Sequence, residues 1–427
     1  MKNLFQLILL ILMTIFPLTA DAQFVTTDNG SFFRNGRPYY YVGTNFWYGA
    51  ILGSEGEGGN RRRLIKELDL MKKQGINNLR VLVGSDGVPG PKAKVQPTLQ
   101  QAPGVYNDTI LAGLDYLLSE MGKRGMVAVL YLNNSWEWSG GYNFYLEHAG
   151  AGKAVMPQDV GYGEFMKHVS QFSVNKKAQQ LFYDYVRFII GRTNRYTGRK
   201  YIDDPAIMSW QIGNEPRAFA KELLPDFEKW LREASALIRS LDAHHLISVG
   251  SEGMWGCENS YESWERICAD KNIDYCNIHL WPYNWGWAKA DSLMENLPRA
   301  CENAKEYIEH HLTIARRLGK PLVMEEFGYP RDDFQFALGT PTKARDGFYS
   351  YVFDLVYRNA QGKEPFAGLN FWGWGGLAKL RHEQWMVGDD YTGDPAQEQQ
   401  GLNSVFSGDK STLKIIRRYC RKLSTIK

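Results

Sequence analysis

The stretch Trp210-Gln211-Ile212-Gly213-Asn214-Glu215-Pro216-Arg217 decides the fold prediction. Residues 206–212 are mostly apolar and lie between Asp204-Pro205 and a glycine, which predicts a short strand buried on both faces, as in a parallel sheet. Pro216 cannot extend a strand, and the residue before a proline is usually extended, so we expect an extended backbone at Glu215. Because (β/α)₈ barrels carry functional side chains at the carboxyl ends of their strands, Glu215 is a candidate catalytic residue.

A second apolar run also ends in acid, at Lys320-Pro321-Leu322-Val323-Met324-Glu325-Glu326-Phe327-Gly328. Two glutamates at two strand ends suit retaining glycoside hydrolysis, in which one carboxyl group is acid and base and the other is the nucleophile. The alternative for either glutamate is an N-cap for the following helix. The matching contexts of the two runs favour catalysis.

Strand and helix patterns alternate along the chain, which predicts a parallel sheet. The expected strands are 39–44, 78–83, 126–132, 206–212, 246–249, 277–280, 321–324 and 366–371. The expected helices are 60–74, 108–124, 175–196, 223–241, 296–318, 342–358 and 412–422. Residues 23–38 should form a hairpin that caps the barrel, and more than thirty residues after the third strand are interpreted as a long aromatic loop. The fold prediction is a single (β/α)₈ TIM barrel over residues 23–427, with no second domain.

The first residues have the pattern of a signal peptide. Lys2 precedes an apolar run over residues 4–18, and Ala20-Asp21-Ala22 is a small-x-small cleavage site. Cleavage after residue 22 would give a secreted or periplasmic protein without a membrane span. The alternative is an uncleaved anchor, although the run is shorter than the ~20 residues that a span needs.

Charge and cysteine content exclude other classes of protein. The net charge of +3 is too small to indicate nucleic-acid binding. The chain has 5 cysteines, an odd number, so at least one has no partner within the chain. The sequence favours a Cys257–Cys268 disulfide in an exposed loop and a buried Cys276. No cysteine or histidine spacing indicates a metal site, and we expect no metal, no cofactor and a monomer.

Around both glutamates the chain resembles glycoside hydrolase family 5, and more narrowly its endo-β-1,4-mannanases. The similarity includes Asn133-Asn134-Ser135-Trp136 after the third strand and the late segment from Gly393-Asp394-Pro395 to Val405, and it covers nearly the whole mature chain. The resemblance implies a retaining hydrolase that cleaves internal β-1,4-mannosidic bonds in mannan, glucomannan or galactomannan.

The resemblance also implies roles for the residues at the strand ends. Glu215 would be the general acid/base. The family pattern of Glu, aromatic and Gly selects Glu326 as the nucleophile. Because neighbouring strand residues alternate, Glu325 would then face the helix layer or a loop, with a cation or a backbone donor as its partner. Arg80 would hold the nucleophile ionised, and Asn214 would bind the sugar 2-hydroxyl.

Further residues would bind the sugar chain. His279 matches the histidine of the family's His-x-Tyr pattern, but Trp281 stands in place of the tyrosine that contacts the nucleophile. Tyr283 and Tyr329 are both candidates to supply that phenol. The residues expected to line the remaining subsites are Trp372 at the floor (with Trp374 as the alternative), Arg217 and Glu252 on the leaving-group side, and Trp136 in a groove wall that extends to Tyr145.

Three other functions are compatible with the same pattern. A β-1,4-glucanase of the family would share the catalytic pair and differ in its subsites, and an exo-acting mannan hydrolase would differ only at the groove ends. A non-catalytic glycan-binding barrel is also possible on fold alone, but it would not need both Glu215 and Glu326.

Arg217 and Glu252 have an alternative role. They could form a salt bridge with each other that only stiffens their loops.

Overall fold

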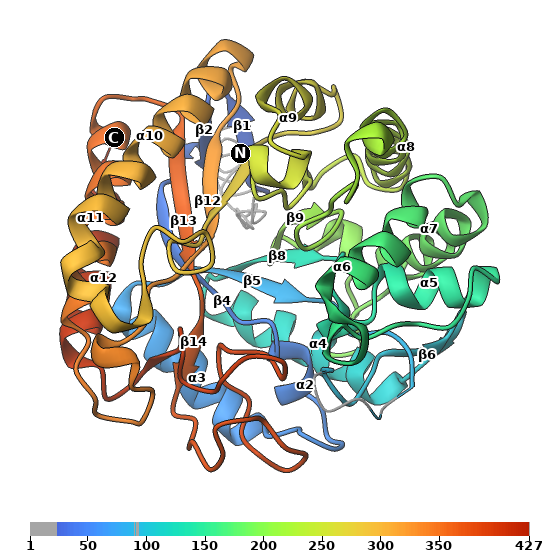
Figure 1. Ribbon diagram of the computed structural model, residues 1–427, viewed down its shortest axis with the longest axis horizontal. Helices are drawn as coiled ribbons and strands as arrows, with labels where there is room; N and C mark the ends of the chain where they lie inside the picture. Colours follow the sequence, from blue (N-terminus) through green and yellow to red (C-terminus); the bar gives the residue numbers. More distant parts are fainter. Residues whose placement is uncertain (1–23, 89, 91–93, 427) are drawn as a thin grey trace, which may run out of the picture.

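The computed structural model describes residues 24–88, 90 and 94–426, and the predicted signal peptide lies outside them. Eight parallel strands form one sheet in the order β10-β9-β8-β5-β4-β13-β12-β11, which confirms the predicted barrel (Figure 1). The strands are β4 Tyr41–Asn45, β5 Asn78–Leu82, β8 Val127–Tyr131, β9 Ile207–Gln211, β10 Leu246–Ser248, β11 Cys276–Leu280, β12 Leu322–Phe327 and β13 Phe366–Phe371.

The barrel closes between β10 and β11 through isolated hydrogen bonds. The Asp274 N–H donates to the Ile247 carbonyl at 2.9 Å. The side-chain oxygen of Asn277 accepts from the N–H groups of Val249 at 3.2 Å and Gly250 at 2.8 Å. The Asn277 side chain thus replaces part of the backbone hydrogen bonding between β10 and β11. The chain is then free to turn away from the sheet at the carboxyl end of β10.

A ring of helices surrounds the sheet and buries its outer face (Figure 1). Each helix presents one apolar stripe: in α7, Phe182, Val186 and Ile189 are buried at three- and four-residue spacing. The helices of the ring are α3 Arg61–Gln74, α4 Asp108–Lys123, α7 Lys176–Ile190, α8 Leu224–Leu241, α9 Tyr261–Cys268, α10 Leu293–Leu318, α11 Lys343–Gln361 and α12 Lys410–Leu423.

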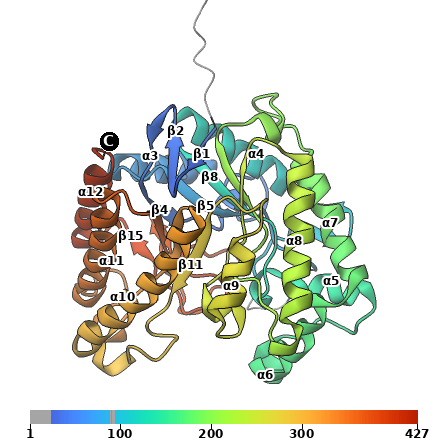
Figure 2. The ribbon, with the colours of Figure 1, turned by 90° about the horizontal axis from the view of Figure 1, so that it is seen from above.

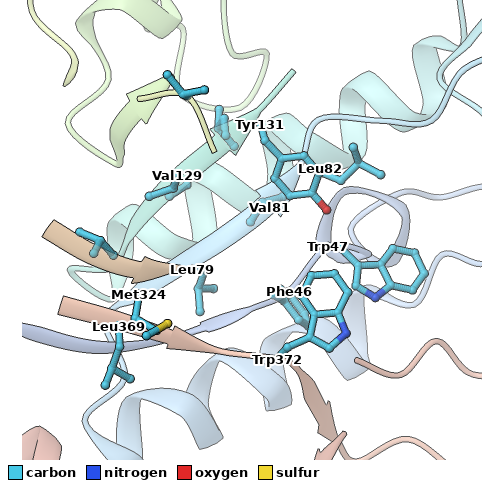
Figure 3. Close-up of a cluster of buried hydrophobic side chains, with 14 of the residues drawn as sticks. Phe46, Trp47, Leu79, Val81, Leu82, Val129, Tyr131, Met324, Leu369 and Trp372 are labelled. Atoms are coloured by element: carbon cyan, nitrogen blue, oxygen red, sulfur yellow. The ribbon is translucent and has the colours of Figure 1, made fainter. Parts of the chain in front are cut away.

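The inside of the barrel is a packed core. Side chains of Leu79, Val129, Met324 and Leu369 converge from four strands, and Trp372 lies beside this cluster (Figure 3). The aliphatic residues fill the barrel, so a ligand can enter only at its end.

A small sheet covers the amino ends of the barrel strands, on the side opposite α6 (Figure 2). It has three strands where a two-stranded hairpin was expected: β1 Thr26–Asp28, β2 Ser31–Arg34 and β3 Arg37–Pro38. Phe32 packs against Tyr41 and Tyr275, and Gly30 donates to the carbonyl of Gly319 at 2.9 Å. This end of the barrel is therefore sealed.

The segment after β8 is folded, so its interpretation as a long loop is wrong. It contains α5 Tyr142–Ala149 and α6 Pro157–Val169. Tyr142 and Tyr145 are buried, and both pack against Phe172. The predicted groove wall therefore ends near Trp138, because the tyrosines beyond it anchor α5 to the core. The remaining short elements are α2 Gly49–Leu52, β6 Gln100–Ala102, β7 Val105–Tyr106, β14 Trp374–Gly376 and β15 Val405–Phe406.

The expected Cys257–Cys268 disulfide is wrong. All five cysteines lie in the described part of the chain as free thiols. Cys257 precedes α9 and Cys268 is its last residue, and both are buried as free thiols. Burial and the neighbouring Cys276 raise the pKa of Cys268, which keeps this thiol unreactive.

None of the helices over residues 24–426 is long and apolar enough to cross a membrane.

Candidate active site

A cavity of about 410 Å³ opens at the carboxyl end of the barrel strands. Carboxyl groups, amides and indole rings line it, as expected for a sugar site, where rings stack on aromatic faces and hydroxyls need polar partners. The lining residues are Trp136, Glu137, Trp138, Tyr162, Met166, Asn214, Glu215, Arg217, Glu252, Trp281, Asn284, Trp285, Glu326, Trp372, Gln397 and Glu398.

Glu215 and Glu326 face each other across this cavity. A carboxyl oxygen of each and a ring nitrogen of His279 all lie within 4.8 Å of one another. His279 Nδ1 is 2.7 Å from Glu215 Oε1 and 3.4 Å from Glu326 Oε2. Burial and the charge of Arg80 lower the pKa of His279 well below its usual value, so the imidazole is neutral and its Nδ1 lies within hydrogen-bond distance of the carboxyl pair.

Arg80, on β5, organises the base of the site. Its Nη1 donates to Glu326 and, at 3.1 Å, to the side-chain oxygen of Asn45. Its Nη2 donates to Asn214 Oδ1 at 2.8 Å, and its Nε donates to Gln211 Oε1 at 2.7 Å. The guanidinium is fully buried and every nitrogen has a partner, so its position is fixed.

Glu215 leaves β9 with a left-handed backbone, at φ 47°, and not in the extended conformation expected before Pro216. This region is unfavourable for a residue with a Cβ, and strain of this kind persists only where neighbours hold it. Ser135 Oγ donates to the Glu215 carbonyl at 2.5 Å, and the Trp136 indole N–H donates to Glu215 Oε2 at 2.6 Å. The β8 loop therefore aims the carboxyl group into the cavity. Trp136 was expected in a groove wall, and the structure gives it this additional contact.

The two carboxyl groups differ in their partners. Burial raises the pKa of both, and the Arg80 guanidinium opposes that rise at Glu326 by direct contact. At Glu215 the charge of Arg217, which is not in direct contact, and the Trp136 N–H oppose the rise instead. The direct Arg80 contact favours Glu326 as the ionised member of the pair.

Glu325 also points into the barrel, which overturns the expectation that it faces the helix layer. The register between β11 and β12 shifts so that Ile278 pairs with Met324 and His279 pairs with Glu326. Glu325 is the extra residue of this bulge, and a bulge breaks the alternation of strand faces. The side chains of Glu325 and Glu326 can therefore both point into the barrel.

Arg217 and Glu252 meet at the cavity on the side away from Trp372. Arg217 Nε donates to Glu252 Oε2 at 2.5 Å, and the guanidinium lies 5.4 Å from the ring centre of Trp136. The salt bridge between Arg217 and Glu252, which the sequence analysis gave as an alternative, is present. Both side chains still line the cavity, so the pair is also available to a ligand.

The aromatic candidates separate into lining and core residues. Trp372 lines the cavity and packs edge-on against Trp281, with ring centres 6.0 Å apart. Trp374, the alternative floor, is buried in the core and donates to Glu67 at 2.9 Å. The Tyr329 hydroxyl donates to the Leu293 carbonyl at 2.6 Å, so it does not supply the expected phenol.

Tyr283 does not supply that phenol either, because it packs against Phe334, away from the carboxyl pair. Tyr131 on β8 lies nearer to the site, with its ring centre 4.5 Å from the Arg80 guanidinium carbon, but its hydroxyl has no hydrogen-bond partner in the described part of the chain. Neither tyrosine candidate therefore supplies the expected phenol, and sequence reasoning did not single out Tyr131.

Sequence reasoning also missed a polar cluster beside Trp372. Glu137 follows the β8 strand, and Gln397 and Glu398 lie in the late loop; all three line the cavity. The Gln397 Oε1, Glu398 Oε2 and Trp372 Nε1 atoms are buried without a hydrogen-bond partner in the described chain. Buried polar atoms usually have partners, so this cluster suits a ligand rich in hydroxyl groups.

Glu215, His279 and Glu326 are close enough together to hold a metal ion in principle. The Arg80 cation contacts Glu326, however, and the charge of Arg217 acts to lower the pKa of Glu215. This arrangement disfavours a further cation. The pair instead fits proton donation by one carboxyl group and attack or electrostatic stabilisation by the other.

Comparison with known proteins agrees with this geometry. The family model described as GH family 5 beta-mannosidase-like matches residues 22–427. The chain belongs to this family. It is a glycoside hydrolase with the (β/α)₈ fold of glycoside hydrolase family 5.

Individual relatives resemble the chain over nearly its full length. A glycoside hydrolase family 5 mannosidase from Rhizomucor miehei is 34% identical, with a TM-score of 0.86, over 95% of this chain and 99% of that one. Mannan endo-1,4-beta-mannosidase 4 of Solanum lycopersicum is 27% identical over 87% of this chain and 90% of its own. The endo-beta-1,4-mannanase of Thermotoga petrophila shares the fold, with 23% identity and a TM-score of 0.68 over 92% of this chain and 78% of that one.

Proposed function

We propose that the protein hydrolyses β-1,4-mannosidic bonds in mannans with retention of anomeric configuration. The observation that carries the mechanism is the approach of the Glu215 and Glu326 carboxyl oxygens to within 4.8 Å. Retaining enzymes hold their carboxyl groups ~5–5.5 Å apart, whereas inverting enzymes hold them ~6.5–9.5 Å apart to admit a water.

In the first step, Glu326 attacks the anomeric carbon while Glu215 gives its proton to the departing oxygen. Arg80 and the neutral His279 hold Glu326 in place for this attack, and the Trp136 N–H fixes the second oxygen of Glu215. Asn214 keeps its side-chain oxygen on Arg80 and donates one amide N–H to Asn134 Oδ1 at 3.3 Å, so its second amide N–H can bind the sugar 2-hydroxyl. In the second step, Glu215 takes a proton from a water whose oxygen attacks the anomeric carbon; the bond between that carbon and Glu326 breaks, and the sugar leaves with the new hydroxyl.

Mannan as substrate is supported by relatives that are named mannosidases or mannan endo-1,4-beta-mannosidases. A mannosyl unit differs from a glucosyl unit by its axial 2-hydroxyl, and polar groups that pair a hydroxyl discriminate strongly between such epimers. The Arg217–Glu252 pair supplies a donor and an acceptor on the leaving-group side of the cavity. We therefore favour mannan over the β-1,4-glucan of the alternative interpretation.

Internal cleavage is the first candidate mode of action, because the curated relatives include the endo-acting enzyme of Solanum lycopersicum. A specific observation favours cleavage at chain ends or of short oligosaccharides as the second candidate. Glu137 of the β8 loop and Glu398 of the late loop both line the cavity together with Trp372. Loops that meet there would restrict how far a chain extends beyond Trp372.

Product analysis on a linear mannan tests both parts of the proposal. Proton NMR during the first turnovers should show β-mannose ends, and inverted products would refute retention. Mixed oligosaccharides early in the reaction indicate internal cleavage, while mannose or mannobiose alone indicates cleavage from ends. Equal or faster turnover of carboxymethylcellulose would refute the mannan assignment.

The processing of the chain belongs to the same proposal. We propose that residues 1–22 are removed on export and that residues 23–427 act as one catalytic domain, as a monomer outside the cytoplasm. Mass spectrometry of the mature protein and light scattering measure both properties directly.

A further inference from the structure

A second buried carboxyl group lies directly beneath the nucleophile, and the proposed mechanism does not use it. Glu325 is fully buried, and its Oε2 accepts from Gln211 Nε2 at 2.6 Å. The Tyr275 hydroxyl is 3.3 Å from its Oε1, and Arg80 Nε is 3.8 Å from its Oε2. A carboxyl group in the barrel interior is costly to bury, and it is placed here by a bulge in β12.

Gln211 connects this carboxyl group to Arg80. Its amide oxygen accepts from Arg80 Nε at 2.7 Å, and its amide nitrogen donates to Glu325 Oε2 and, at 3.0 Å, to Ser248 Oγ. If the amide were flipped, its N–H groups would face the Arg80 N–H. A serine hydroxyl can donate or accept, so Ser248 permits either orientation, whereas an oxygen of Glu325 that accepts permits only the observed one.

The orientation of Gln211 in turn determines where Arg80 lies. Gln211 accepts from the Nε edge of the guanidinium, and Asn214 accepts from Nη2. The remaining Nη1 is then directed at Glu326. Without an acceptor at Nε, the buried cation would have an unpaired donor and could turn toward another oxygen, which would weaken its pairing with the nucleophile.

The charge state of Glu325 matters for the same reason. Arg80 carries one positive charge, and both Glu325 and Glu326 lie near it. Burial raises the pKa of Glu325 to about 7, so below that pH the group is mostly protonated and does not compete with Glu326 for the positive charge of Arg80. The other titratable groups near Glu325 are Tyr275 and Tyr41, which are also buried and stay neutral at that pH.

We propose that Glu325 is a positioning residue whose carboxyl oxygen acts through Gln211 to hold Arg80 against the nucleophile Glu326. The inference rests on the proposed function, since it assigns Glu326 as the nucleophile. It predicts that the carbonyl oxygen at position 325 is needed and that the charge is not.

Replacement of Glu325 tests this with an aryl β-mannoside as substrate. Glu325→Gln keeps an oxygen that accepts from Gln211, so kcat should stay within about threefold of the wild type. Glu325→Leu removes that oxygen, and kcat should fall about 10- to 100-fold with KM changed less than about twofold, because the loss affects transition-state charge. The acidic limb of kcat/KM should move up by about one pH unit, since that limb reports the ionisation of the nucleophile in the free enzyme.

Two further variants distinguish a loss of Arg80 positioning from a general loss of stability or folding. Gln211→Met removes the hydrogen bonds that join Arg80 to Glu325 and leaves Glu325 in place. It should shift the acidic limb of the kcat/KM profile in the same way, even if Glu325→Leu does not fold. Tyr275→Phe is the matched control, because it removes the other contact to Glu325 and leaves Gln211 in place; its limb should not move. The double variant Glu325→Leu/Gln211→Met should be no worse than either single variant, because both act on one connection.

An unshifted acidic limb in folded Glu325→Leu or Gln211→Met would overturn the inference, as would a Glu325→Gln variant as impaired as Glu325→Leu. A crystal structure of Glu325→Leu gives a readout independent of turnover. Arg80 should be displaced from Glu326, and an unmoved Arg80 would count against the inference. A wild-type protein without activity on any mannoside would refute the proposed function, while the displacement of Arg80 would still test the positioning.

Discussion

The raised pKa of Glu325 predicts a pH dependence of stability that needs no substrate. The folded protein holds the Glu325 proton up to about pH 7, whereas an ordinary glutamate loses it near 4.5. Between these values the folded state binds more protons than the unfolded state, so the free energy of unfolding falls as pH rises. The effect should be absent below about pH 4.5 and complete above about pH 7, since there both states have the same protonation.

The magnitude follows from the size of the shift. A difference of about 2.5 pH units at 1.36 kcal/mol per unit corresponds to about 3 kcal/mol of unfolding free energy. Side-chain exposure of Glu325 is 0%, so solvent does not screen this contribution. A loss of this size is a substantial part of the 5–15 kcal/mol that typically stabilises a domain.

Urea denaturation of the wild type and Glu325→Gln across pH 4–8 measures this contribution. Groups common to both proteins cancel, so the advantage of the wild type over the variant should shrink by about 3 kcal/mol between pH 4.5 and 7.5. Glu228→Gln is the control with opposite sign. Arg266 and Ser263 lower the pKa of Glu228 against the effect of burial, so its contribution is present at neutral pH and is lost as pH falls. Parallel curves for the wild type and Glu325→Gln would refute the assignment of a neutral Glu325.

Three further predictions concern the carboxyl pair, the leaving-group side and the thiols. Glu326→Gln should lower kcat by at least about 10³-fold with an unchanged melting temperature, while Glu325→Gln stays active; the reverse result would exchange their roles. Arg217→Ala should impair hydrolysis of mannotriose more than that of polymeric mannan, because a short chain has fewer other contacts, and equal losses would limit the Arg217–Glu252 pair to stiffening its loops. A thiol reagent should leave the buried Cys257, Cys268 and Cys276 unmodified in the native protein and titrate 5 thiols after unfolding; a smaller number would indicate a disulfide.

The sequence predicted the barrel because its signals are local and repeated. Each strand is a short apolar run, each helix has a 3.6-residue apolar stripe, and glycine or proline separates them. The segment after β8 was harder to predict. Its helices α5 and α6 carry aromatic residues such as Tyr142 and Tyr145 that suit either a groove or a core, and only the packing against Phe172 distinguishes the two.

The errors at the site have one physical origin, which is the assumption of regular backbone at strand ends. Alternation of strand faces excluded Glu325 from the interior, but the bulge in β12 admits it next to Glu326. The preference for an extended residue before proline suggested an extended Glu215, but its φ is 47°. Neither irregularity has a local sequence signal, because each is held by contacts with distant segments, such as the donation from Ser135 to the Glu215 carbonyl.

These two irregularities are also what makes the site reactive. A left-handed Glu215 turns from the end of β9 toward the Trp136 N–H, and the bulge on β12 aims Glu326 at Arg80 while Glu325 lies beneath. In a regular β12 strand Glu325 and Glu326 would point to opposite faces, and Glu325 would not lie beneath Glu326. The stable barrel thus holds one left-handed residue and one bulge at its site. Relaxing either one, for example by a deletion at Glu325 that restores the β11–β12 register, should separate the carboxyl groups and abolish turnover, and activity in such a deletion variant would refute this view of the site.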